Sequence, residues 1–248
     1  MVPRALRPVG VALVDKPAGP SSFAIVAALR RRTRARTGHA GTLDPFATGL
    51  LVLLSGAATR LAPCFVGLDK RYVTDVELTS TTSTGDPEGE VIEQHPAPAQ
   101  SELEAALERL RGEVELPIPA ASAVKIGGER AYKLARRGVT VEMPLRRSLV
   151  HSLDVIAYTG ESVQLALHVN SGTYVRSIAQ ALGGHCTTLR RTSVGPFDVA
   201  EAADVEHAVL LPAGETLARL PESALDRVPA AVRAGVLALD EPTQGSAA

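Results

Sequence analysis

The sequence has little of the chemistry on which many enzyme classes depend. Its 248 residues include two cysteines, Cys64 and Cys186, which form neither a disulfide framework nor a metal motif, and we expect both to be reduced. The six histidines are scattered without a His-x-x-x-His pair, which argues against catalytic zinc. No Gly-x-Gly-x-x-Gly or Gly-x-x-x-x-Gly-Lys-Ser/Thr loop supports a nucleotide cofactor, and no Gly-x-Ser-x-Gly elbow marks a hydrolase.

Long apolar runs are also missing. No stretch reaches the roughly 18 apolar residues that would cross a membrane, and no signal-peptide core follows the first residues. We therefore expect a cytoplasmic protein with no membrane partner. The chain is 45% hydrophobic and 21% charged, as is usual for a globular protein. The net charge of −1 is uneven, because residues 1–200 carry an excess of positive charge and residues 201–248 an excess of negative charge. This distribution allows a phosphate-binding surface without requiring one.

The most distinctive stretch is the glycine-rich run from Gly38 to Leu50. It lies between an arginine cluster at residues 30–36 and an apolar run at residues 50–54, and Asp44 is its one carboxylate. Glycine lets a backbone approach a ligand closely, so the run could place a reactive acid beside a polyanion. An Asp-Pro pair alone is usually a turn, and an arginine-rich helix face is usually solvated. The local pattern therefore leaves both interpretations open.

The pattern of apolar and polar residues predicts an α+β fold with a mixed sheet. Strands are expected at residues 9–14, 50–54, 70–78, 90–93, 147–158, 162–169 and 187–194. Helices are expected from an N-cap at Ser21 or Ser22, over 57–62 with a stop at Pro63, over 101–111 with a capping box from Ser101 to Glu104, and over 172–182. Several strands follow one another without an intervening helix, which favours this fold class. Residues 112–147 are expected to form a mobile or extended insert with a short basic helix over 129–137.

Several motifs in order resemble one known family. The run Gly38-His39-Ala40-Gly41-Thr42-Leu43-Asp44-Pro45-Phe46-Ala47-Thr48-Gly49-Leu50-Leu51 strongly resembles the catalytic motif of the TruB family of tRNA pseudouridine synthases. Other segments look like the remaining family landmarks in the same order: 14–19, 69–72, 122–125 with 131–138, 171–177 and 189–192. The likeness covers roughly residues 9–220, and the ordered set is far more specific than any single piece.

The resemblance implies a pseudouridine synthase fold, with a mixed, mostly antiparallel central sheet flanked by helices and a mobile RNA-contacting insert. It implies an isomerase that converts the T-loop uridine at tRNA position 55 to pseudouridine without cofactor or metal. The partner would be the T-arm of tRNA, and we expect a monomer. Two alternatives stay open: a non-catalytic tRNA-binding or tRNA-folding protein, and a synthase acting on another RNA with a T-loop-like hairpin.

The resemblance also assigns roles to individual residues. Asp44 would start the reaction, either as a nucleophile at the sugar or by promoting loss of the C2′ proton. Arg176 would be its partner, since an adjacent guanidinium favours an ionised carboxylate. Tyr72 would stack on the target base and handle the C5 proton. The other substrate-binding candidates are Tyr174 and Leu189 in the pocket, His39 where the flipped base has left, and Lys16 and Lys125 for phosphate contact or loop support.

The domain organisation follows from the same likeness. We expect a catalytic domain over residues 1–215, with the insert at about 112–147, and a short C-terminal tail over 216–248. Relatives usually continue into an RNA-binding module of the PUA type, and residues 217–239 resemble only the approach to it and its first helix. The sequence therefore predicts a vestigial module.

Overall fold

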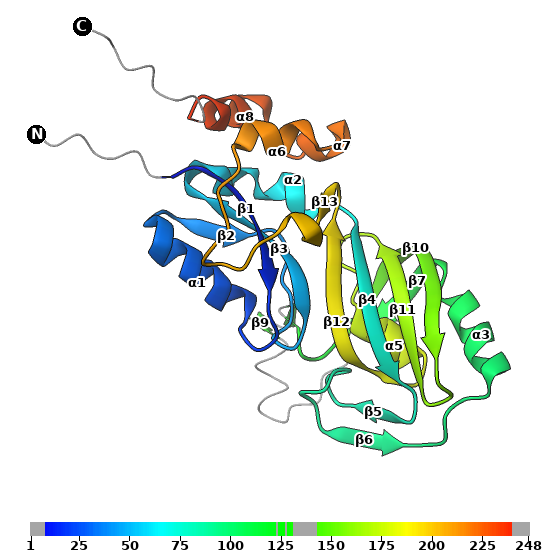
Figure 1. The fold of residues 1–248 in the computed structure, drawn as a ribbon. Coiled ribbons are helices and arrows are strands. Elements are labelled where there is room, and N and C mark those ends of the chain that lie inside the picture. The colour runs from blue at the N-terminus through cyan, green and yellow to red at the C-terminus, as the bar shows by residue number, and fades with distance from the viewer. Residues whose placement is uncertain (1–7, 123, 127, 131–142, 240–248) are drawn as a thin grey trace, which may run out of the picture. The chain divides into compact units, whose positions relative to one another are not determined.

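A computed structural model describes residues 8–122, 124–126, 128–130 and 143–239 of the chain (Figure 1). The chain divides into two compact units. Unit 1 comprises residues 1–70 and 190–248, and unit 2 comprises residues 71–189. None of the helices in the described ranges has both the length and the apolar character needed to cross a membrane.

Unit 1 is organised around the strand that follows the glycine-rich run. Strand β3 (Thr48–Ser55) pairs antiparallel with β1 (Gly10–Lys16) and β2 (Thr37–His39). It also pairs in parallel with the end of β12 (His185–Val194), which itself pairs with β13 (Phe197–Asp198). The residues of β3 from the second onward are all buried, which explains why its sequence is continuously apolar.

Two helical segments of unit 1 test the helix boundaries that the sequence predicted. Helix α1 (Ser22–Thr33) has Ser21 as its N-cap, whose hydroxyl accepts a hydrogen bond from the Ala24 N–H at 3.2 Å. A 3-10 turn, η1 (Gly56–Leu61), leads into helix α2 (Ala62–Val66). The expected helix stop at Pro63 is wrong, because the proline lies in the first turn of α2, where its missing N–H costs nothing.

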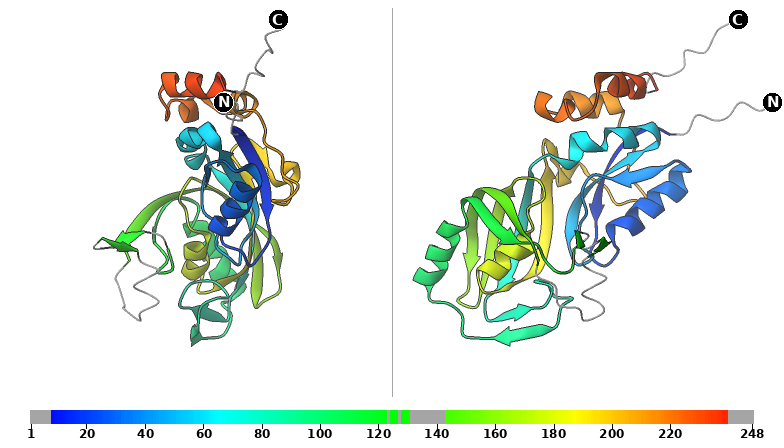
Figure 2. Two further views of the ribbon diagram at one scale, coloured as in Figure 1. Left: turned by 90° about the vertical axis from the view of Figure 1, so that its left-hand side faces the viewer. Right: turned by 180° about the vertical axis from the view of Figure 1, so that it is seen from behind.

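The C-terminal helices pack on the core of unit 1. After the short turn η2 (Val199–Glu201) come α6 (Ala213–Ala218), α7 (Glu222–Leu225) and α8 (Ala230–Leu237), which form one layer over η1 and α2 in Figure 2. Leu217, Leu220 and Val236 belong to the same buried cluster as Leu50 and Phe65. The compact unit therefore continues past residue 215, where the sequence placed the start of a tail.

Unit 2 carries a sheet in the order β12, β4 (Lys70–Glu77), β11 (Ser162–Val169), β10 (Leu145–Tyr158) and β7 (Gly112–Pro117). The β10–β11 and β10–β7 pairs are antiparallel. Alternate residues of β4 are buried from its first position onward, as its sequence predicted. With the parallel β3–β12 pair, the sheets are mixed and mostly antiparallel, which confirms the α+β class.

The remaining elements of unit 2 correct one boundary. They are the β5–β6 hairpin (Ser80–Thr82 and Val91–Gln94), α3 (Gln100–Arg109) and α5 (Val175–Ala181). The capping box predicted from Ser101 to Glu104 is wrong by two positions. Glu102 instead accepts the backbone N–H of Ala99 at 2.9 Å, so the cap lies at Ala99 and α3 starts at Gln100.

The predicted insert is smaller than its sequence suggested. Its first residues form β7 and its last form the start of β10, which pair in the sheet. Between them, β8 (Lys125–Ile126) and β9 (Glu129–Arg130) form a short hairpin. The basic helix expected from residue 129 is contradicted at residues 129–130, which are strand, and the rest of it lies outside the described residues.

The parallel β3–β12 pair makes a testable demand on Gly49. A Cβ at this position would lie 2.2 Å from the carbonyl oxygen of Arg191, and the backbone φ of +101° disfavours any other residue. We expect Gly49→Ala to lower the free energy of unfolding by about 2–4 kcal/mol in urea titrations. Gly38→Ala is the matched control, because a Cβ there meets open space and φ is not positive. Equal stability of the two variants would contradict this packing.

Candidate active site

Asp44 lies in the turn that precedes β3. Its side chain is half-buried, and its carbonyl accepts the backbone N–H of Ala47 at 3.2 Å. The next carbonyl, that of Pro45, accepts the N–H of Gly19 at 2.8 Å. The Asp-Pro pair is therefore a turn, as the local sequence indicates, and the turn is tied to the loop after β1.

Lys16, the last residue of β1, supports this turn from inside the protein. Its side chain is fully buried, and its ammonium donates to the carbonyls of Pro17 at 2.8 Å, Pro45 at 3.1 Å and Ala47 at 2.7 Å. A buried ammonium is tolerated only where acceptors replace water, and two of these acceptors, Pro45 and Ala47, lie one and three residues after Asp44. Of the two roles expected for Lys16, phosphate contact or loop support, this geometry corresponds to loop support.

Ser22, the first residue of α1, holds the residue before Asp44. Its buried hydroxyl donates to the Leu43 carbonyl and accepts the Leu43 N–H, both at 2.8 Å. Ser21 caps the helix, so its neighbour is free to make these two contacts. The neighbouring serines thus have separate roles, one for the helix and one for the loop.

Arg191 of β12 joins the two ends of the loop. Its side chain is 1% exposed, and its Nε donates to the Leu50 carbonyl at 2.7 Å. Its two terminal nitrogens donate to the carbonyls of Thr42 at 3.3 Å and Gly41 at 3.2 Å. The guanidinium offers donors in a fixed planar arrangement, so these contacts restrict the loop on both sides of Asp44.

His39, at the end of β2, faces the same guanidinium. Burial lowers the pKa of His39 from its usual value near 6.5, and the positive charge of Arg191 lowers that pKa further. Its Nδ1 is buried without a hydrogen-bond partner in the described parts of the chain. The imidazole is therefore neutral at pH 7, a form that can both donate and accept a hydrogen bond.

Unit 2 holds the aromatic candidates. Tyr72 lies on the buried parity of β4, and Tyr174 is the half-buried N-cap residue of α5. Leu189, in the part of β12 that belongs to unit 2, is buried. Lys125 lies in β8 and pairs through its backbone with Arg130. The roles that the family likeness gives these residues in binding a base or RNA stay predictions.

Arg176, in the first turn of α5, is deeply buried and part of a polar cluster. Its guanidinium is ion-paired with Asp86 at 3.1 Å and donates to the carbonyls of Thr84 at 2.8 Å and Ala121 at 3.0 Å. The Asp86 carboxylate also accepts the Thr84 hydroxyl at 2.5 Å and the Glu88 N–H at 3.0 Å. Arg176 is thus no solvated surface charge, and its pairing with Asp44 stays a prediction.

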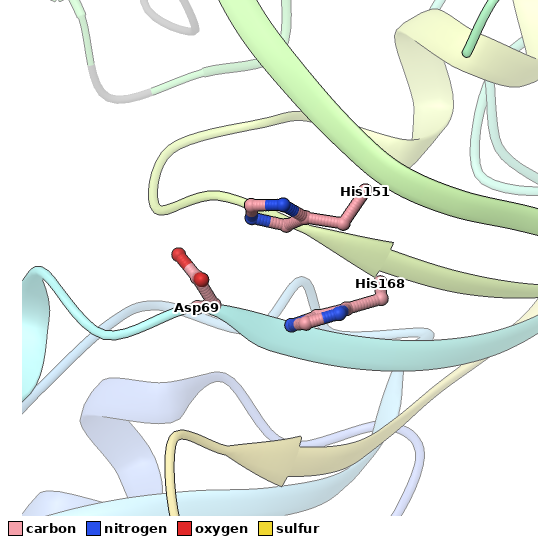
Figure 3. A group of neighbouring side chains, drawn as sticks. All are labelled: Asp69, His151 and His168. Atoms are coloured by element: carbon pink, nitrogen blue, oxygen red, sulfur yellow. The ribbon is translucent and has the colours of Figure 1, made fainter. Parts of the chain in front are cut away.

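Two histidines of unit 2 belong to a group of residues that could ligate a metal ion. His151 of β10 and His168 of β11 stack with ring centroids 4.5 Å apart and an interplanar angle of 34° (Figure 3). Asp69, also drawn there, belongs to unit 1. Two imidazoles are fewer than the three protein ligands of a catalytic zinc site. The expectation of no metal stays a prediction.

Three supporting residues escaped sequence reasoning. Ser22 was considered only as a helix cap, Arg191 only as part of a short motif, and Asp86 only as a residue of a polar loop. Each of them takes part in contacts between segments more than 20 positions apart in the chain, and the spacing of residues in the sequence does not predict such contacts. The one available signal was that Arg191 shares the strand parity of Leu189, which is buried.

The low pKa of His39 predicts a specific pH dependence. Because the folded protein binds a proton on His39 less readily than the unfolded chain does, stability falls as pH drops below about 6.5. We expect His39→Gln to weaken this dependence, with the wild type and variant compared by urea titration at pH 7.5 and pH 5.5. His207→Gln, an exposed histidine, is the control. Identical pH profiles for His39→Gln and the wild type would contradict the neutral state.

The chain is similar in sequence to a known family and to several of its members. Residues 30–175 match the family model described as the TruB family pseudouridylate synthase N-terminal domain. A tRNA pseudouridine synthase B of Azoarcus sp. (strain BH72) is 39% identical over 92% of this chain and 73% of its own length. One of Mycobacterium sp. (strain KMS) is 43% identical over 78% of this chain and 69% of its own length.

Solved structures agree at the level of the fold. The structure of a Cbf5–Nop10–Gar1 complex matches with a TM-score of 0.58 and 28% identity, over 76% of this chain and 50% of that chain. A structure of an H/ACA RNP bound to a substrate RNA containing 2′-deoxyuridine matches with a TM-score of 0.56 and 25% identity, over 76% and 48%. The match to the family model covers the Asp44 loop, Tyr72 and Tyr174, and this chain belongs to the TruB family of pseudouridylate synthases.

Proposed function

We propose that this protein is a tRNA pseudouridine synthase that isomerises the T-loop uridine at tRNA position 55, acting in the cytoplasm as a monomer. The observation that carries the proposal is the Asp44 turn, which buried Lys16, Ser22 and Arg191 hold through its backbone. The relatives described above are named tRNA pseudouridine synthase B, which supports tRNA as the substrate class. The T-arm would be the part of the tRNA that the protein contacts.

The proposed reaction uses a carboxylate held in a fixed position and requires no cofactor. The bond between N1 and C1′ breaks, the base turns, a bond forms between C5 and C1′, and the C5 proton is lost while N1 gains one. Atoms and electrons balance within the substrate, so no oxidant or reductant enters. The target nucleotide must first leave its stack, because its glycosidic bond is otherwise out of reach. Asp44 would then act at C1′ as a nucleophile or promote loss of the C2′ proton.

The other residues serve that carboxylate and the extruded base. Arg176 would pair with Asp44, and Asp86 would fix the guanidinium through the ion pair between them. Tyr72 would stack on the base and handle the C5 proton, while Tyr174 and Leu189 would enclose the base. Neutral His39 would contact the RNA where the base has left, and Lys125 would approach a phosphate.

The direct test removes the charge of Asp44 and keeps its shape. We expect Asp44→Asn to lower the rate of pseudouridine formation in a tRNA transcript by at least about 10²-fold, with the dissociation constant for that tRNA nearly unchanged. Asp154→Asn, at an exposed position of β10, is the matched control and should leave both values unchanged.

The outcomes separate the alternatives. Normal turnover by Asp44→Asn would refute the role of this carboxylate. A wild-type protein that binds tRNA but forms no pseudouridine would favour a non-catalytic RNA-binding function. Pseudouridine found only in another RNA with a T-loop-like hairpin would replace the proposed substrate.

The adjacent serines provide a test of loop positioning. Ser22→Ala should lower the free energy of unfolding by about 1–3 kcal/mol, because two buried groups of Leu43 lose their partner. It should also lower kcat by up to about 10²-fold with little change in KM for tRNA, since a small displacement of a catalytic group is costly. Ser21→Ala should cost about 1 kcal/mol of stability and leave kcat unchanged, because only the helix cap is lost. Equal kcat values for both variants would contradict the positioning role.

A further inference from the structure

The exposed side of α1 combines an aromatic ring with several arginines. Phe23 is 67% exposed, and Arg30, Arg31 and Arg34 are exposed as well. Phe23 and Arg30 follow the spacing i, i+7, which puts them on one stripe along the helix, and Arg34 is the C-cap residue just beyond its last turn. At 1.5 Å per residue, Phe23 and Arg30 lie about 10 Å apart along the helix axis. Figure 1 shows α1 on the outside of unit 1.

These three arginines lack the partners that would explain them structurally. Helix α1 contains no acidic residue, and among the described residues none of the three forms an ion pair. Arg32 differs, because it donates to the carbonyls of Val205 and Ala208. The helix C-terminus stabilises some positive charge, but it offers no acceptor geometry for three separate guanidinium groups.

Arg34 also occupies a backbone conformation that favours another residue. As the C-cap of α1 it has φ 52° and ψ 23°, and its N–H donates to the Arg30 carbonyl at 2.8 Å. It is the one non-glycine residue with positive φ in the described ranges. Glycine is the usual residue at this kind of cap because it has no Cβ. An arginine kept there against backbone preference points to a use for its side chain.

The other end of the stripe lies next to the Asp44 loop. Phe23 directly follows Ser22, whose hydroxyl is bonded to both backbone groups of Leu43, the residue before Asp44. Phe23 is therefore adjacent in sequence to the residue that holds the Asp44 loop. Aromatic side chains stack on unpaired bases, and guanidinium groups bind the phosphates of the adjoining stem.

We propose that Phe23, Arg30, Arg31 and Arg34 form an RNA-binding surface for the T-arm, with Phe23 stacking on an unpaired nucleotide of the loop and the arginines contacting phosphates of the stem. The inference rests on the proposed function for its choice of RNA. It extends that function with a surface on α1 outside the catalytic motif, and it assigns a use to the arginine cluster.

Arg34→Gly is the sharpest variant, because it separates binding from folding. Glycine suits the left-handed cap, so the midpoint of thermal unfolding should not fall. Affinity for a T-arm hairpin should fall, and the ratio of affinities at 50 and 200 mM salt should shrink roughly threefold for the lost phosphate contact. The double variant Arg30→Gln/Arg31→Gln keeps the helix and should shrink that ratio further. Arg109→Gln, at an exposed position in the last turn of α3, is the control.

Phe23 is tested on RNAs with and without unpaired bases. Phe23→Ala should weaken binding of the hairpin roughly 5- to 100-fold and leave binding of a fully paired duplex of the same stem unchanged. Phe23→Tyr should bind like the wild type, and Val209→Ala, at another exposed apolar residue, should have no effect. Unchanged hairpin affinity in Arg34→Gly and the double variant would overturn the arginine contacts. An equal loss on hairpin and duplex would overturn the stacking.

Pseudouridine formation, assayed separately, keeps the two proposals distinguishable. Weakened binding by these variants with no pseudouridine formed by the wild type would retain the surface and remove the proposed function. Pseudouridine formed by the wild type, with affinity unchanged in every variant, would retain the function and remove the surface.

Discussion

The site depends on hydrogen bonds from two buried cations to the backbone around Asp44. Lys16 and Arg191 are each almost completely removed from water, and each donates to carbonyls of the loop. A charge in such a place is tolerated only when acceptors replace its hydration, so the loop and the cations stabilise each other. The loop can place one carboxylate reproducibly although glycines interrupt it, because its backbone is held from β1, α1 and β12 at once.

The sheet of unit 1 makes that arrangement possible. Arg191 reaches the loop because β12 runs parallel to β3, and this close approach leaves no room for a side chain at Gly49. Gly49 of the motif is therefore required by the packing of the protein. In the pseudouridine synthase fold of this chain, the same strand pair builds the core and supports the candidate catalytic turn. Unit 2 also contains a buried cation whose lost hydration is replaced by protein groups. There the Arg176 guanidinium is ion-paired with the buried Asp86 carboxylate.

Local patterns made most of the strands predictable. The alternation in β4 and the apolar run of β3 reflect burial on one face or both, which sequence records directly. The motif likeness located Asp44, although its surrounding charges alone indicated no more than a turn. The roles of Ser22, Arg191 and Asp86 were not predictable, because each depends on contacts between distant segments. The start of α3 and the fate of Pro63 were misjudged because a cap or a proline fits more than one position in a first turn. The length of the insert was overestimated because the alternation in β7 spans only a few residues and the first residues of β10 are exposed, so both resemble an exposed segment.

The central claim is that the Asp44 carboxylate starts the isomerisation of a uridine without a metal ion or an added cofactor. The most direct measurement is chemical mapping of pseudouridine in one defined T-arm hairpin and in whole tRNA, each incubated with the wild-type protein in a buffer containing a metal chelator and no added cofactor. The account predicts pseudouridine at the single T-loop position in both RNAs. Tight binding of both RNAs with every uridine unchanged would contradict it.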